Sequence, residues 1–161
     1  MNCVSNDLID HSQSSFYISD KPPPDFIFPS PSMMCKVYHP FTIDGNVCDT
    51  ISMELQSEIM NFIKIHDCTE SGNVTEMSQE TFDRFLCIPC LIGVLSVGNK
   101  IVGTMFTILL RAHVHNLSDD FITSYTTFLC IDKNYREQGL AMALIRGIMK
   151  QGYTRYGVNH G

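Results

Sequence analysis

The sequence predicts an α/β fold in which helices pack on a mixed β-sheet, and two observations indicate this class. The first is a pair of apolar runs, 91–97 and 101–110, around a Gly-Asn-Lys turn, which is typical of an antiparallel hairpin. The second is an apolar run at 121–131, followed by a helical pattern over 137–151 and a short strand-like run at 154–158. A strand–helix–strand crossover of this kind places its two strands parallel.

Composition limits the class of protein further. The chain has 161 residues, is 44% hydrophobic and carries a formal net charge of -6. This length fits one domain, and the acidic balance argues against nucleic acid as a partner. No apolar run reaches the roughly 18 residues of a transmembrane segment, and the N-terminus lacks a basic and apolar export signal. The 7 cysteines are odd in number, so we expect reduced thiols in a cytoplasmic protein.

The N-terminal residues 1–33 differ from the rest of the chain. They hold most of the prolines, including three in a row at 22–24, and many Ser and Asp residues. Such a composition predicts a flexible, extended arm. Its aromatic residues Phe16, Tyr17, Phe26 and Phe28 leave a second interpretation open, an arm that folds over a ligand site. We expect the globular domain to span 34–161.

Between the arm and the hairpin, the pattern predicts one strand and two helices. Val37, Tyr38, Phe41 and Ile43 indicate a first strand, although Pro40 interrupts it. Asp49 or Thr50 is a candidate cap for a helix whose apolar face recurs at helical spacing. That face consists of Leu55, Ile59, Phe62 and Ile63. Ser78 opens a second, short helix, and Gly152 is the expected end of the helix at 137–151.

The stretch that carries chemistry follows the strand ending at Ile131. A polar loop with Gly139 leads into a helix whose first turn has small residues, so backbone amides there could meet an anionic group. Residues 132–161 hold five basic side chains against two acidic ones, in a chain that is acidic overall. This reversal favours a phosphate-bearing ligand. The alternative is an ordinary solvated loop that caps a helix.

Two motifs in this stretch resemble known families. Arg136 to Ala141, REQGLA, resembles the R/Q-x-x-G-x-A pyrophosphate loop of the GCN5-related N-acetyltransferase superfamily. The strand Phe128-Leu129-Cys130-Ile131 and the helix residues Leu144-Ile145-Arg146 resemble the N-terminal lobe of glycylpeptide N-myristoyltransferases at the same spacing. The resemblance extends over about 78–161. It implies an acyl-CoA N-acyltransferase fold.

The resemblance also implies a mechanism and a set of site residues. The backbone amides of Phe128 and Leu129 would form an oxyanion hole for a thioester. The backbone of Leu129, Cys130 and Ile131 would bind the pantetheine arm. The pyrophosphate would be bound by Arg136, Glu137, Gln138, Gly139, Leu140 and Ala141. The cosubstrate would be acyl-CoA, either myristoyl-CoA or acetyl-CoA, and the acceptor a peptide or protein amine such as an N-terminal glycine. No general base can be assigned, and we expect no metal.

Departures from the myristoyltransferase pattern keep a second function open. The loop at Glu137, Gln138 and Gly139 is less basic than in that family and has the acetyltransferase-like form. The chain also ends at Gly161, before the remainder of such a protein, which indicates a fold incomplete at its C-terminus. A non-catalytic module that binds acyl-CoA or a protein partner is therefore the alternative. An exposed C-terminal strand would then favour self-association.

Cysteines offer other candidates for chemistry. Cys87 and Cys90 form a C-x-x-C motif, which is a possible zinc half-site or redox pair. No second motif of this kind accompanies it, and it lies before a strand rather than at the start of a helix, so buried or half-exposed thiols are favoured. Cys130 is a possible nucleophile, but an inert thiol in an apolar strand is the preferred interpretation.

Overall fold

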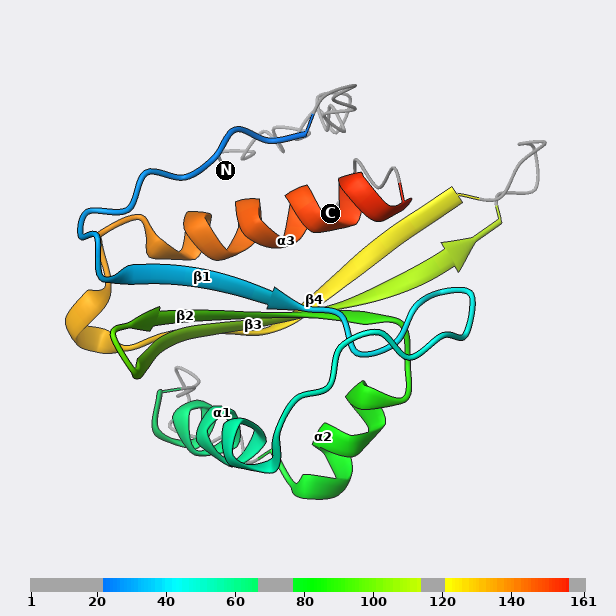
Figure 1. Ribbon diagram of the computed structural model, residues 1–161, viewed down its shortest axis with the longest axis horizontal. Helices are drawn as coiled ribbons and strands as arrows, with labels where there is room; N and C mark the ends of the chain where they lie inside the picture. The colour runs from blue at the N-terminus through cyan, green and yellow to red at the C-terminus, as the bar shows by residue number, and fades with distance from the viewer. Residues whose placement is uncertain (1–21, 67–76, 114–120, 157–161) are drawn as a thin grey trace, which may run out of the picture.

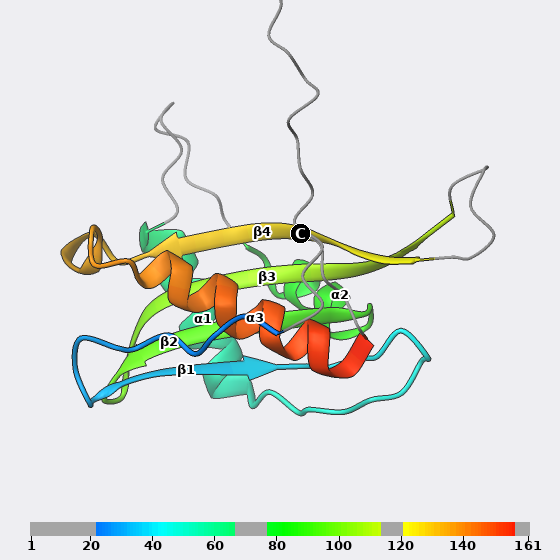
Figure 2. The same ribbon diagram turned by 90° about the horizontal axis from the view of Figure 1, so that it is seen from above.

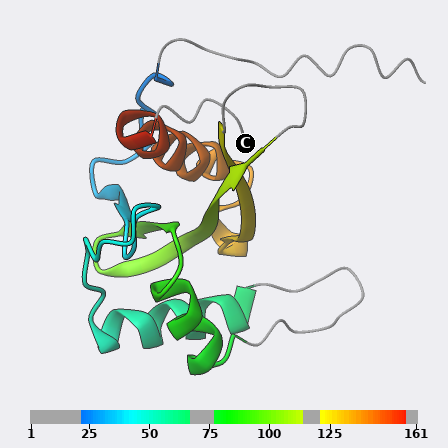
Figure 3. The same ribbon diagram turned by 90° about the vertical axis from the view of Figure 1, so that its right-hand side faces the viewer.

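A computed structural model describes residues 22–66, 77–113 and 121–156, which form three layers. A β-sheet lies in the middle, with α3 on one face and α1 and α2 on the other (Figures 1 and 3). The elements are β1 Met33–Tyr38, α1 Met53–His66, α2 Gln79–Leu86, β2 Cys90–Val97, β3 Lys100–Ala112, β4 Phe121–Ile131, the 3₁₀ turn η2 Lys133–Tyr135 and α3 Leu140–Tyr156. The α/β class predicted from the sequence is confirmed.

The sheet has the strand order β1-β2-β3-β4, and every neighbouring pair is antiparallel. The view from above shows α3 crossing the four strands obliquely (Figure 2). The hairpin predicted around residues 98–100 is confirmed as β2 and β3, with Val97 opposite Lys100. The predicted last strand at 154–158, and with it the parallel pair, is wrong at residues 154–156, because these form the last turn of α3. Residues 157 and 158 lie outside the described part of the chain.

Contacts at the end of α3 explain why the helix continues past Gly152. The Tyr156 hydroxyl lies 2.8 Å from His39 Nε2, and the Arg155 guanidinium lies 3.2 Å from His39 Nδ1. A glycine inside a helix costs only about 1 kcal/mol, which these partly buried polar contacts can offset. The strand edge expected in this segment is therefore absent at residues 154–156. Within the described residues, β1 and β4 are the edge strands of the sheet.

Two further boundaries differ from the sequence interpretation. The first strand begins earlier, at Met33, and ends before Pro40, which has no backbone N–H to donate to a neighbouring strand. Helix α1 begins after Ser52, whose Oγ accepts a hydrogen bond from the Leu55 amide at 3.3 Å. Asp49 does not cap this helix. Its carboxylate accepts from the His39 amide at 2.6 Å.

Apolar side chains fill both spaces between the layers. One cluster lies under α1 and α2 and includes Ile59, Ile63, Phe82, Ile92 and Phe106. The other lies under α3 and includes Leu91, Leu95, Val102, Leu140, Leu144 and Ile148. Strand β2 contributes to both, which explains its continuous apolar sequence. Gly93 permits close packing of α3, because a Cβ there would lie 3.0 Å from Ile148 Cδ1.

The described part of the N-terminal arm, residues 22–32, runs along α3 (Figure 1). Phe26 and Phe28 pack against the cluster under α3, and Asp25 forms an ion pair with Lys150 at 2.5 Å. The division of the chain at residue 33 stays a prediction. None of the described helices combines the length and the apolar character needed to cross a membrane.

Candidate functional site

A bulge interrupts β4 at Phe128 and Leu129. The antiparallel register passes from Thr104–Cys130 to Phe106–Thr127, so that two residues of β4 face one residue of β3. Phe128 has a φ of 50°, which is unusual for a residue with a side chain. Its ring packs against Phe106 and Phe85, with centroid distances of 5.6 and 5.9 Å. These contacts stabilise the strained backbone.

The bulge reverses which residues of β4 face α3. Before it, Ser124 and Thr126 lie on the α3 side of the sheet; after it, Leu129 does. Phe128 and Cys130 pack on the opposite side, in the cluster under α1 and α2. The amides of Phe128 and Leu129, predicted as oxyanion donors, thus lie where the ladder with β3 is interrupted. Their catalytic role stays a prediction.

A tightly held turn connects the end of β4 to α3. Asp132 is 1% exposed; its carboxylate accepts hydrogen bonds from Lys100 Nζ at 2.7 Å and from the Asn134 amide at 3.0 Å. Arg136 Nε donates to the Ile131 carbonyl at 3.2 Å. These bonds fix the loop against β3 and β4, so that the residues that follow enter α3 from a defined position.

The turn before α3 contains two residues with positive φ. Glu137 and Gly139 have φ values of 63° and 73°, and the side chains of 136–138 are exposed. The Gly139 carbonyl accepts from the amides of Met142 and Ala143, so helix geometry leaves the Leu140 and Ala141 amides without an acceptor inside the helix. Such amides, together with the helix dipole, suit an anion.

Charges around the turn are partly neutralised. The hydrogen bond from Lys100, followed by that from the Asn134 amide, lowers the pKa of Asp132. The hydrogen bond between Lys100 and Asp132 also raises the pKa of Lys100. Burial lowers the pKa of His66, which lies 4.0 Å from Asp132. The Lys100 ammonium group is therefore paired with the Asp132 carboxylate. The exposed cations closest in sequence to the turn are Lys133 and Arg136.

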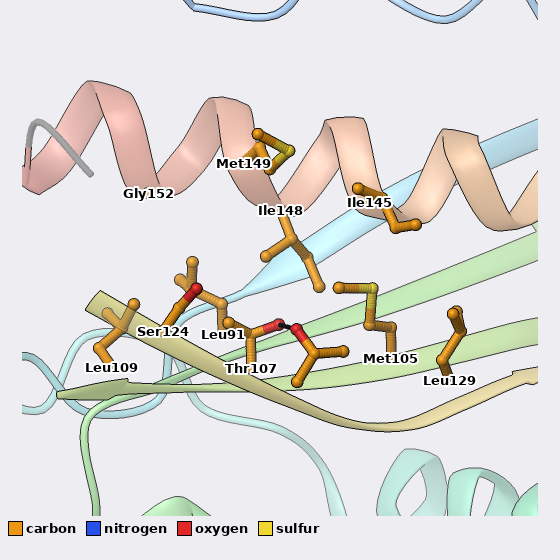
Figure 4. A pocket seen from close by; sticks show the side chains of 11 residues that line it. Leu91, Met105, Thr107, Leu109, Ser124, Leu129, Ile145, Ile148, Met149 and Gly152 are labelled. Carbon is orange, nitrogen blue, oxygen red and sulfur yellow. Dashed lines mark hydrogen bonds between the residues drawn. The ribbon is translucent and has the colours of Figure 1, made fainter. Parts of the chain in front are cut away.

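A cavity of about 280 Å³ opens beside the bulge, between α3 and the strands β3 and β4 (Figure 4). Its lining is mainly aliphatic and thioether side chains, with hydroxyls from Thr107, Ser124 and Thr126. No His, Asp, Glu, Lys or Tyr is among the described residues that line it. The sequence interpretation missed this cavity. Because its lining comes from four elements, no local sequence pattern indicated it.

The cysteine candidates have the character of buried or surface thiols. Cys90 is fully buried, burial raises its pKa to about 12, and its thiol donates to the Phe85 carbonyl. Cys87 is exposed, and Cys130 is 3% exposed. Among the described residues, no group of three or more His, Cys, Asp or Glu side chains could hold a metal ion, and none of the described cysteines forms a disulfide.

Solved structures of acetyltransferases have a fold similar to that of this chain. An acetyltransferase of the GCN5-related family from Ralstonia eutropha superposes with a TM-score of 0.53 at 16% identity, covering 80% of each chain. A Trypanosoma brucei acetyltransferase gives 0.52 at 13% identity, covering 75% of this chain and 76% of the other. The protein therefore has a fold of the GCN5-related N-acetyltransferase type.

A third similar structure comes from a longer chain. It is a conserved protein from Enterococcus faecalis described as a probable N-acyltransferase, with a TM-score of 0.55 at 11% identity. The match covers 78% of this chain and 27% of that one. No family model and no curated protein matches the sequence. At these identities the similarity shows the fold alone.

Proposed function

We propose that this protein is an acyl-CoA-dependent N-acyltransferase that transfers an acyl group from the CoA thioester to an amine. The acceptor class is a peptide or protein amine such as an N-terminal glycine. The fold neighbours favour acetyl-CoA as the cosubstrate, and the sequence resemblance to myristoyltransferases adds myristoyl-CoA. The described cysteines, none in a disulfide, fit activity in the cytoplasm.

The observation that carries the proposal is that two irregular backbone segments lie on either side of the end of β4. The bulge at Phe128–Leu129 and the positive-φ turn at Gly139 lie at the two ends of the β4–α3 link. In the proposed complex, Arg136 to Ala141 bind the pyrophosphate, and the backbone of Leu129, Cys130 and Ile131 binds the pantetheine as an added strand would.

The proposed reaction is direct transfer. The amine nitrogen attacks the thioester carbonyl carbon, a C–N bond forms, and negative charge develops on the carbonyl oxygen. The amides of Phe128 and Leu129 stabilise that charge. The C–S bond then breaks, CoA leaves as the thiolate, and the proton lost by the nitrogen passes to that thiolate. A base that accepts this proton is not among the described residues lining the cavity.

This lack of a lining base favours one second candidate, a module that binds acyl-CoA without turnover. Both functions require the same cosubstrate site. They differ in whether CoA thiol is released when acyl-CoA and a glycyl peptide are supplied together. Release above the uncatalysed rate supports the enzyme, and tight acyl-CoA binding with no release supports the module.

Calorimetric titration with CoA tests the shared site, with Gly139→Glu as the variant. Glutamate places negative charge in the turn, at a φ of 73° that side chains rarely adopt, with the Phe26 ring 3.7 Å from the new Cβ. We expect the affinity for CoA to fall by roughly tenfold or more, about 1.4 kcal/mol.

Gly45→Glu is the matched control, because Gly45 has a φ of 85° with open space around it, away from the turn. It imposes similar backbone strain and should keep the wild-type CoA affinity. Equal CoA affinity in wild type and Gly139→Glu would contradict the assignment of the turn.

A further inference from the structure

The cavity beside the bulge has the character of a site for a hydrocarbon chain. The apolar side chains in its lining come from four elements, β2, β3, β4 and α3, and include Leu91, Met105, Leu129, Ile145, Ile148 and Met149. Figure 4 shows Ile145, Ile148 and Met105 pointing into the space between helix and sheet. Two of the three hydroxyls, those of Thr107 and Thr126, lie 3.3 Å apart and hydrogen-bond to each other. An apolar occupant leaves that pair satisfied, whereas a charged one would find no counter-ion among the described residues that line the cavity.

The position of the cavity relative to the proposed cosubstrate site is equally informative. Leu129 belongs both to the bulge and to the cavity lining. Along α3, the lining begins at Ile145 and ends at Gly152, roughly 8 and 18 Å from Leu140 at the helical rise of about 1.5 Å per residue. A ligand with its phosphates at the start of α3 and its carbonyl at the bulge would therefore direct its acyl chain into this space.

The volume limits the length of that chain. A cavity of about 150 Å³ accommodates benzene, which has six carbon atoms. At the same packing, a cavity of about 280 Å³ accommodates roughly ten carbons. An acetyl group would leave most of the cavity empty, and a myristoyl chain would extend beyond it.

We propose that this cavity binds the hydrocarbon chain of the acyl donor and selects medium-length acyl groups of about eight to ten carbons. The inference rests on the proposed acyl-CoA function, and it makes a medium-chain acyl-CoA the preferred donor in place of acetyl-CoA or myristoyl-CoA. Side chains on the α3 face of β3 and β4 then determine the preferred acyl chain length. The turn before α3 binds only the CoA portion, which is common to all these substrates.

The test is a calorimetric comparison of CoA, acetyl-CoA, decanoyl-CoA, myristoyl-CoA and free decanoate, each with the full chain. Each methylene buried should tighten binding roughly fourfold, so decanoyl-CoA should bind at least about a hundredfold more tightly than acetyl-CoA. Myristoyl-CoA should bind no more tightly than decanoyl-CoA. Decanoate alone should bind weakly, because it lacks the contacts of the CoA portion.

A pair of variants on β4 locates the effect. Thr126→Phe places a ring in the cavity from an exposed strand position that tolerates aromatic residues. Thr123→Phe is the matched control, because alternation along the strand places residue 123 on the opposite face from Ser124. We expect Thr126→Phe to reduce the decanoyl-CoA affinity to that for acetyl-CoA, with CoA binding unchanged, and Thr123→Phe to retain the selectivity. Thermal melting confirms that each variant is folded.

The outcomes separate this inference from the proposed function. Equal affinities for all the CoA species, or unchanged selectivity in Thr126→Phe, would overturn the inference and leave the proposed function standing. Binding of decanoate with no binding of any CoA species would overturn both and identify a fatty-acid site instead.

Discussion

Phe128→Ala tests whether an aromatic anchor maintains the bulge in β4. The Phe128 ring is half-buried and forms edge-to-face contacts with Phe85 and Phe106. Truncating a fully buried Phe costs about 3–5 kcal/mol, and each aromatic pair accounts for about 0.5–1.5 kcal/mol. For a half-buried ring we expect a loss of about 2–3 kcal/mol in the free energy of unfolding, measured by urea denaturation.

The same change should affect turnover more than binding. Without its ring anchor, residue 128 can relax to extended backbone, and the amides of residues 128 and 129 lose their alignment with the thioester oxygen. Losing one oxyanion donor reduces kcat by about 10²–10³. The KM for acyl-CoA should change less than kcat, because the turn at 136–141 and the backbone of Cys130 and Ile131 are untouched. Steady-state release of CoA thiol, with a glycyl peptide as acceptor, measures both parameters.

Phe82→Ala is the matched control for this experiment. Phe82 is fully buried and pairs with Phe106 at 5.8 Å, within the same aromatic cluster but away from the bulge. It should lower stability by about 3–5 kcal/mol and retain kcat. A wild-type kcat in Phe128→Ala, or an equal fall of kcat in both variants, would refute the link between the ring and the donors.

The remaining predictions concern a thiol and a buried histidine. Cys130→Ser should keep activity within roughly tenfold, about 1.4 kcal/mol, because direct transfer uses the backbone; an acyl group trapped on Cys130 in the wild type, found by mass spectrometry, would contradict this. Burial, followed by the charge of Arg155, lowers the pKa of His39, so the unfolded chain binds more protons as the pH falls below about 6.5. The free energy of unfolding should therefore decrease from pH 7 to pH 5, and this decrease should be smaller in His39→Gln than in the wild type. Urea denaturation at the two pH values measures both decreases. If they are equal in wild type and variant, His39 is excluded as the cause.

Elements with strong local signals were predictable from the sequence. The hairpin follows from its two apolar runs around a Gly-Asn-Lys turn, and α2 begins after the predicted cap Ser78, whose side chain accepts from the Thr81 amide at 3.1 Å. Helix α1 was predictable from the spacing of its buried residues Ile59, Phe62 and Ile63. In these segments local preference and tertiary packing favour the same structure.

Segments fixed by distant contacts were not predictable in the same way. The end of α3 depends on His39, more than a hundred positions away in the sequence, which binds Arg155 and Tyr156. A local pattern contains no information about such a partner, so the sequence alone predicts a helix end at Gly152. The site shows the same division: the turn around Gly139 has a recognisable local composition, whereas the cavity is assembled from four elements.

At the bulge, the alternating pattern of a regular strand predicts the wrong face of the sheet for the side chains of β4. The bulge also lies between the proposed oxyanion donors and the cavity. Strict alternation over 121–131 would place Phe128 on the same face as Ser124 and Thr126, which line the cavity. A regular strand would therefore direct the Phe128 ring into that cavity. The extra residue turns the ring into the cluster under α2 and brings the smaller Leu129 to the α3 side. One local irregularity thus interrupts the ladder at the proposed donors and keeps the adjoining cavity open. An insertion or deletion that restored the regular alternation should therefore abolish turnover and chain-length selectivity together.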